Sequence, residues 1–281
     1  MLRAGPVLLL LLLVFGSAVF GQTPASVAPS PAQPTGTIGI AYSIAFWGIP
    51  FGQTDYEGKF ADGSYSASSR FETNGVVSLF WQASIHASAN GHVTPQTLTP
   101  AQYDSHFQRG EAKNESVRVS FDGNGAETFA DPPYDMTKYP VTAAEKHEAV
   151  DPMSAVTLVL AGVRADRANP CGTVAPVFDG RRRYNIEFAF VKDEPVTLGR
   201  LYSGPAHLCR LRYRQIAGFK PKILKEGAAF PPIFAEFADI PAAGAPNGHY
   251  VVALKLWAHV DWGTVTAQLT ELRIPAPATK G

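Results

Sequence analysis

The sequence lacks an excess of either charge, which limits the partners that it can attract over a distance. Its 281 residues contain 24 Lys and Arg and 24 Asp and Glu, so the formal net charge is zero at pH 7. Proteins that bind nucleic acid through a general basic field carry a clear positive balance. We therefore expect no nucleic-acid partner, and any electrostatic recognition must be local.

Fingerprints of catalysis are also missing. The chain contains no Gly-x-Ser-x-Gly nucleophile elbow, no phosphate-binding glycine loop and no dinucleotide-binding fingerprint. His147-Glu148 begins like the zinc-protease motif His-Glu-x-x-His, but Asp151 stands where the second histidine would be. The other histidines have no ligand spacing, so we expect no metal and no cofactor. A non-enzymatic protein is predicted, and a hydrolase without a recognisable motif is an alternative only if acidic residues converge in the fold.

Long apolar runs are absent except at the N-terminus. Arg3 precedes an unbroken apolar segment, Leu8–Phe15, and the small residues Gly16, Ser17 and Ala18 follow it. This is the pattern of a secretory signal peptide, which we place at residues 1–21, with cleavage after Ala18 as the alternative to cleavage after Gly21. The alternative is an uncleaved membrane anchor, although the segment is slightly short for a span.

The composition of the remaining chain predicts three regions. The first is rich in Pro, Ala and Ser and shows no periodicity, which is typical of a disordered linker. A long ordered region follows, and the last few residues again resemble a linker. The predicted divisions are a linker at 22–36, a single β domain at 37–275 and a disordered tail at 276–281.

Cysteine is scarce, since Cys171 and Cys209 are the only two. A signal peptide would bring both to an oxidising compartment, and an even number favours pairing. We predict a Cys171–Cys209 disulfide. Its loop of about 38 residues would stabilise the fold by about 4 kcal/mol in the chain-entropy description.

What the sequence does contain is alternation with a period of two, typical of strands. Large side chains of the first segment share one face: Ile38, Ile40, Tyr42, Ile44 and Phe46. Residue pairs that tolerate the positive φ of hairpin turns recur at Asp62-Gly63, Asn74-Gly75, Asn90-Gly91 and Asp122–Gly125. The sequence predicts a mainly β fold, an antiparallel meander that forms a curved sheet or an open β-barrel around one central apolar helix.

That helix is predicted to begin at Asp151 and to end near Ala165. Asp151 can accept hydrogen bonds from the first free amides, and Pro152 suits the first helical turn. Large apolar side chains recur at helical spacing: Met153, Val156, Leu160 and Val163. We expect the face with Met153, Val156 and Leu160 to border a ligand space.

The middle of the chain resembles a known family. The residues that carry the resemblance are Asp151–Ala155, Pro170-Cys171, Val177–Tyr184 and Cys209–Tyr213, with Gly218 and Phe219. They are similar to exported Gram-negative bacterial proteins catalogued as domain of unknown function 3108. The resemblance implies a periplasmic, mostly β protein of the cell envelope with no established activity, in which a helix plugs a curved sheet.

Arginines alternate along one predicted strand. Arg210, Arg212 and Arg214 share a face there, and Arg183 is expected to share a face with Arg181 on a neighbouring strand. Pairing of the two strands would gather a basic patch, which further cations extend: Lys220, Lys222 and Lys225. This patch could bind a lipid phosphate or another anion. The alternative is a solvated outer face, balanced by Glu187, Asp193 and Glu194.

Aromatic side chains pose a similar choice between a cavity and a filled core. The residues concerned are Phe46, Trp47, Phe80, Trp81, Phe188, Phe190, Trp257 and Trp262. The favoured interpretation is a periplasmic binding protein for an apolar or amphiphilic, lipid-like ligand. The alternative is a structural or interaction module of the envelope, with envelope proteins as partners and a filled core.

Overall fold

The computed structural model describes residues 35–274. Five internal segments and one single residue are left out of that description: 76–77, 79–81, 111–112, 164–169, 228–229 and Trp262. The predicted signal peptide, the linker up to residue 34 and the tail from 276 lie outside the described residues, as do Phe80 and Trp81. The first strand begins at Gly36, within one residue of the predicted start of the β domain.

Thirteen antiparallel strands form one sheet. Their bounds are β1 (Gly36–Phe46), β2 (Ile49–Ala61), β3 (Ser64–Thr73), β4 (Ala83–Val93), β5 (Leu98–Arg109), β6 (Lys113–Phe121), β7 (Ala126–Asp131), β8 (Val174–Phe178), β9 (Arg183–Leu198), β10 (Tyr202–Ala217), β11 (Ile233–Pro241), β12 (His249–Val260) and β13 (Gly263–Arg273). The order is β7 to β1 and then β13 to β8, so pairing of β1 with β13 joins the two halves of the chain. The prediction of a mainly β meander in a curved, open sheet is confirmed.

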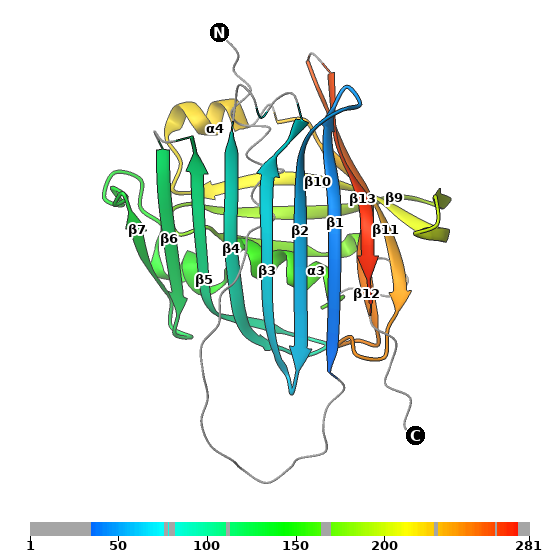
Figure 1. Cartoon of the computed structure of the whole chain (residues 1–281). Helices are drawn as coiled ribbons and strands as arrows, with labels where there is room; N and C mark the ends of the chain where they lie inside the picture. Colours follow the sequence, from blue (N-terminus) through cyan, green and yellow to red (C-terminus); the bar gives the residue numbers. More distant parts are fainter. Residues whose placement is uncertain are drawn as a thin grey trace.

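The two halves of the sheet face one another. Strands β1 to β7 stand upright at the front of the view, whereas β9 and β10 run across behind them (Figure 1). The large side chains predicted to share a face of β1 point into the space between: Ile38, Ile40, Tyr42 and Ile44 are all buried in the core. Strand alternation therefore placed the core face of β1 correctly.

One predicted hairpin turn is wrong. Asn90-Gly91 lies inside β4, where the pairing with β5 shifts register between these two residues. A Cβ atom on Gly91 would come within 2.2 Å of the carbonyl oxygen of Thr99, so glycine here permits a close backbone approach in a bulge. The chain turns later, where the amide of Thr94 donates to the carbonyl of Thr97.

Three α-helices and one 3₁₀ turn complete the described elements: α2 (Ala143–His147), α3 (Pro152–Leu160), α4 (Pro221–Gly227) and η2 (Pro170–Gly172). Helix α3 starts as predicted, because the amide of Ser154 donates to Asp151 Oδ1 at 2.8 Å. Among the described residues, no helix has the length and apolar character needed to cross a bilayer.

Helix α3 ends earlier than predicted, at Leu160 rather than near Ala165. Gly162 adopts a left-handed conformation with φ +62°. The amide of Gly162 donates to the carbonyl of Val159, and the amide of Val163 donates to the carbonyl of Leu158. These two hydrogen bonds form a Schellman motif that ends the helix. At 1.5 Å per residue the helix is about 14 Å long rather than about 20 Å.

Two hydroxyl contacts join α3 to the sheet. Ser154 Oγ lies 2.5 Å from the hydroxyl of Tyr65 on β3, and Thr157 Oγ1 lies 2.9 Å from the hydroxyl of Tyr56 on β2. Helix α3 also contacts β4, β5, β8 and β12. The helix is consequently buried on nearly every side, and Val156 and Val159 are its only half-buried residues.

The predicted disulfide is present. Cys171 in η2 and Cys209 in β10 are bonded, with Cα atoms 5.4 Å apart, and both are fully buried. The bond ties the segment that follows α3 to β10, beside an apolar cluster that contains Leu211, Phe237 and Val251.

Candidate functional site

A cavity of about 160 Å³ lies between α3 and the sheet. Side chains of α3, β1, β2 and β8 to β13 line it, and none of them is charged. The polar side-chain atoms in this lining are tyrosine hydroxyls; that of Tyr42 donates to the carbonyl of Ala253 at 2.8 Å, and that of Tyr56 meets Thr157. The cavity therefore suits an apolar ligand, and its lining contains no Asp, Glu, His, Lys or Arg side chain.

Helix α3 presents a different face to the cavity from the one predicted. Val156 and Leu160 line the cavity as expected, together with Pro152, Ala155 and Val159. Met153 does not line it, since its side chain is 1% exposed and packs in the main core. The hydroxyl contacts of Ser154 and Thr157 with the sheet fix the rotation of the helix, and they direct Val156 and Val159 to the opposite side. Apolar periodicity alone does not reveal that rotation.

A buried polar chain anchors the N-terminus of α3. Ser154 donates its hydroxyl to Asp151 Oδ2 and also contacts Tyr65, and none of the three residues lines the cavity. Burial raises the pKa of Asp151 to about 6, although the hydrogen bonds from Ser154 lower it. Burial likewise raises the pKa of Tyr65 far above its usual range. Asp151 and Ser154 have no exposed surface, so this Asp–Ser–Tyr chain is closed to a substrate and holds the helix in place.

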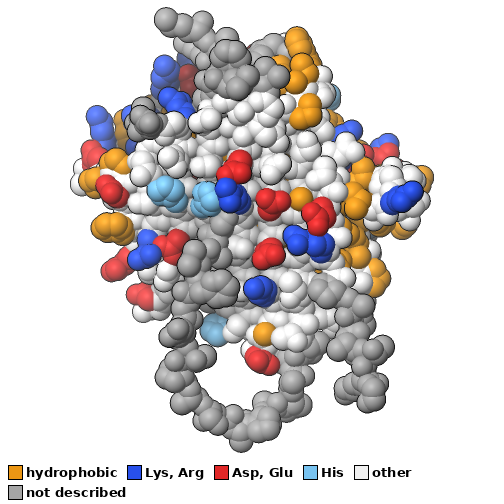
Figure 2. Space-filling model, viewed as in Figure 1, with side chains coloured by type: hydrophobic (Ala, Val, Ile, Leu, Met, Phe, Trp, Pro, Cys, Tyr) orange, Lys and Arg blue, Asp and Glu red, His pale blue; other side chains and the backbone are white. Residues whose placement is uncertain are grey.

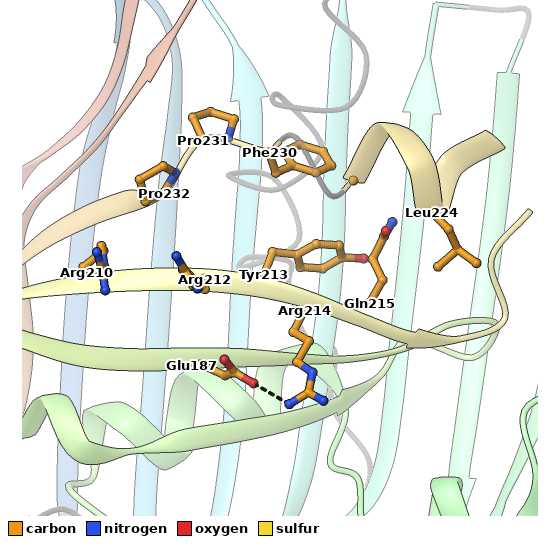
Figure 3. Close-up of a pocket in the computed structure, with 11 residues that line it drawn as sticks. Glu187, Arg210, Arg212, Tyr213, Arg214, Gln215, Leu224, Phe230, Pro231 and Pro232 are labelled. Carbon is orange, nitrogen blue, oxygen red and sulfur yellow. Dashed lines mark hydrogen bonds and ion pairs between the residues drawn. The ribbon is translucent and has the colours of Figure 1, made fainter. Parts of the chain in front are cut away.

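The three alternating arginines of β10 line a second, outer hollow. Arg210, Arg212 and Arg214 are exposed along β10 and border a groove of about 470 Å³ (Figure 3). Arg214 pairs with Glu187 at 3.3 Å, whereas Arg210 and Arg212 form no ion pair in the part of the chain that the structure describes. The opposite wall is apolar and includes Leu224, Phe230 and Pro232.

Arg183 does not join this groove, contrary to the prediction. The β9–β10 register places it opposite Ala217 and places Glu187 opposite Arg212. The Arg183 side chain is buried, and its guanidinium donates to the carbonyl of Glu145 at 3.0 Å and to Asn185 Oδ1 at 2.6 Å. It therefore fastens α2 to β9 rather than binding a ligand.

The aromatic residues predicted to line a cavity or fill the core lie in different environments. Phe188 lines the cavity, whereas Phe46 packs beside Ile44 in a smaller cluster. Trp47 is 68% exposed in the β1–β2 turn and Phe190 is 45% exposed on β9. Trp257 stacks on Phe234 and lies outside the cavity lining. Of the five residues of this predicted set that the structure describes, only Phe188 lines the cavity.

Potential metal ligands do not gather in the described part of the chain. No group of three or more His, Cys, Asp or Glu side chains is placed there to hold a metal ion. The cavity and the outer groove are two hollows in that part of the chain.

Residues 41–270 match the family described as protein of unknown function (DUF3108). The chain belongs to the DUF3108 family. Within the matched range lie both cysteines, the whole of α3 and nearly all of the cavity lining. No curated protein matches this DUF3108 chain.

A solved structure has a similar fold. It is described as the crystal structure of a beta-barrel-like protein of domain of unknown function DUF1849 from Brucella abortus. The TM-score is 0.52 and the identity 10%, with 85% of the DUF3108 chain and 98% of the other chain covered. At that identity the likeness establishes the fold alone.

Proposed function

We propose that this DUF3108 protein is a non-enzymatic binding protein that holds an apolar or amphiphilic ligand between α3 and the concave side of the sheet. In this account α3 is the central element around which the sheet curves. The observation that carries the proposal is the cavity, whose lining has no charged side chain. A helix buried on every other side leaves Val156 and Val159 half-buried only where they face this space.

The size of the cavity indicates the class of ligand. Its volume of about 160 Å³ is close to that of engineered apolar cavities of about 150 Å³ that bind benzene. Sites for complete drug-sized molecules are larger, about 300–1,000 Å³. The cavity suits a segment of an acyl chain or one small ring, so a larger amphiphile would leave its polar part outside.

The location proposed for this activity is the periplasm. The buried Cys171–Cys209 disulfide supports export, because such bonds persist in oxidising compartments. The apolar run near the N-terminus supports the same location. No cofactor is part of the proposal, and other envelope proteins would be its partners in delivering or receiving the ligand.

The alternative of a structural module with a filled core is less well supported, since the space beside α3 is not filled by described side chains. The hydrolase alternative is less well supported for a different reason. The buried carboxylate next to a hydroxyl that the described residues contain is Asp151, beside Ser154, and it has no exposed surface and borders neither hollow.

Native mass spectrometry of protein purified from the envelope fraction tests the proposal. We expect the parent protein to carry an apolar molecule that organic solvent extracts. The Val156→Trp variant should retain the fold, as judged by circular dichroism, and lose that molecule because the indole occupies the cavity. A parent protein without any bound molecule, also after incubation with a fluorescent fatty acid, would contradict the proposal.

A further inference from the structure

We propose that one end of the sheet docks onto an anionic phospholipid bilayer. The docking end comprises the β1–β2 turn with Trp47 and Ile49, helix α4, and the arginine groove beside β10. The turn and α4 both lie at the upper end of the molecule in Figure 1. The inference extends the proposed function, since a bilayer would supply the apolar ligand, but it stands on separate residues.

Trp47 occupies a conformation that does not suit it. Trp47 and Gly48 form the two-residue turn with φ values of +52° and +77°. Such turns favour Asn, Asp and Gly, because a side chain is strained at positive φ. Burial does not compensate the strain here, since Trp47 is 68% exposed. The ring contacts Phe46 and lies against Gly263, yet most of its surface stays exposed, and a contact made outside the chain would cover that surface.

The surroundings of Trp47 indicate an apolar contact. Ile49, next to the turn, is 63% exposed, and the Trp47 ring stacks on Phe46 with centroids 5.3 Å apart. Indole rings favour the bilayer interface, where an apolar body and a polar N–H are both accommodated. Ile44, three residues before Trp47 on β1, already lines the apolar cavity, so the turn and the cavity are neighbours along one strand.

Helix α4 adds both apolar and basic side chains to the same end. Ile223 and Leu224 are 39% and 42% exposed. Three exposed lysines lie on either side of this pair in the sequence: Lys220, Lys222 and Lys225. Mixed apolar and basic residues of this kind are typical of segments that lie in the headgroup region of anionic membranes. The exposed apolar and cationic residues are thus adjacent in one element.

The arginine groove supplies a site for a phosphate. Strand β11 pairs with β10 only as far as Leu211 opposite Ile233. From Arg212 onward, β10 pairs with β9 on one side, and no described strand pairs with it on the other. The groove opens at this position, with Arg210 and Arg212 on one side and Phe230, Pro231 and Pro232 above them (Figure 3). Guanidinium groups bind phosphate oxygens in a bidentate manner, and Leu224 brings the groove into contact with α4.

The charge balance favours an anionic bilayer. Acidic residues near the docking end are few: Glu187 is already paired with Arg214, and Glu226 and Asp261 are exposed. Among the described residues, these two carboxylates stand against Arg210, Arg212 and the three lysines of the α4 segment. The front face of the sheet differs, since acidic and basic side chains are interspersed there (Figure 2). Local attraction therefore exists although the whole chain has no net charge.

The Trp47→Asn variant tests docking without disturbing the fold. Asparagine suits positive φ, so the variant should fold at least as well as the parent while losing the indole. The matched control is Phe129→Ser, which removes an aromatic side chain that is 70% exposed on the edge strand β7 and belongs to none of the three parts of the docking end. The charge variant is Arg210→Ala with Arg212→Ala. Its control, Lys59→Ala with Arg118→Ala, removes two cations from exposed positions of β2 and β6.

The experiment is sedimentation of the full exported chain with vesicles of phosphatidylcholine, with and without about one third phosphatidylglycerol. We expect the parent to prefer the anionic vesicles. Trp47→Asn should lower partitioning at least about tenfold on both vesicle types, because an aromatic side chain is lost from the interface. The double arginine variant should lose only the preference for anionic vesicles, and both controls should match the parent.

Three outcomes would overturn the inference. The parent could fail to bind either vesicle, Trp47→Asn could bind as the parent does, or inorganic phosphate could bind to the groove with no vesicle binding, which would make it a site for a soluble anion. Val156→Trp distinguishes this inference from the proposed function. This variant should still bind vesicles. If it loses the cavity ligand but still binds vesicles, the docking surface acts independently of the cavity.

Discussion

The hydroxyl of Tyr56 on β2 lies 2.9 Å from that of Thr157 on α3, across 101 residues of sequence. Together with the contact between Tyr65 and Ser154, it fixes one side of the helix to the front of the sheet. The opposite side, with Val156 and Val159, then faces the cavity. A pair of hydroxyls thus decides which apolar side chains a ligand would meet.

Removal of the Tyr56 hydroxyl should weaken this attachment. We expect Tyr56→Phe to lower the free energy of unfolding by about 1 kcal/mol, the net contribution of a typical buried hydrogen bond. Thr157 would still donate to the carbonyl of Met153, so no hydroxyl is left without a partner. Urea denaturation measures the loss. Tyr202→Phe, at a less buried tyrosine of β10, is the control and should stay within about 0.5 kcal/mol of the parent.

Asp151 should make stability depend on pH in a defined direction. Burial raises the pKa of Asp151 from its usual value near 3.8 to about 6. The folded state therefore binds the proton more tightly than the unfolded state. The stabilisation is complete below about pH 4 and is lost as the pH rises through 6, a change of about 3 kcal/mol.

Asp151→Asn isolates this effect from the other carboxylates, because its side chain can still accept from the Ser154 amide but cannot ionise. The stability of the variant relative to the parent should rise between pH 4 and pH 7 by about the same 3 kcal/mol. Denaturation at a series of pH values measures the difference. A difference that does not change with pH would show that the carboxyl titrates normally.

The disulfide should contribute strongly to stability. Cys171 and Cys209 are 38 residues apart, and closing a loop of that size contributes about 4 kcal/mol in the chain-entropy description. We expect the double variant Cys171→Ala, Cys209→Ala to lose about that much, and reduction of the parent to have a similar effect. Mass spectrometry of the alkylated, unreduced protein provides the check, since two modified thiols would show that the bond does not form.

The cavity should tolerate added volume where the core does not. Val156→Trp places an indole into open space, so we expect it to cost less than about 1 kcal/mol. Val163→Trp makes the same substitution at a fully buried residue outside the cavity lining and should cost about 1–3 kcal/mol or more. Thermal unfolding of the two variants compares them directly. Equal destabilisation would indicate that both sites are close-packed.

Local rules predicted much of the fold. Alternation marked the buried face of β1, Asp151 and Pro152 marked the start of α3, and the only two cysteines proved to be bonded. Each of these depends on neighbouring residues or on a count, so a sequence can show it. The antiparallel meander could also be predicted, because successive strands joined by short turns usually pair with one another.

What the sequence could not show depended on contacts between distant residues. Asn90-Gly91 has the composition of a turn, but Thr99 and Tyr65 approach it closely and make it a bulge. The rotation of α3 depends on tyrosines about ninety to one hundred residues away. Arg183 is drawn into the interior by the backbone of Glu145, which no alternation pattern reveals.

The most direct test of the central claim is to locate an apolar ligand in solution. Nuclear Overhauser contacts between a bound medium-chain fatty acid and isotope-labelled valine methyl groups would show where the chain lies. We expect contacts from the acyl methylenes to Val156 and Val159, none to the packed Val163, and loss of binding in Val156→Trp. Saturable binding whose contacts avoid both Val156 and Val159, or no binding at all, would contradict the account.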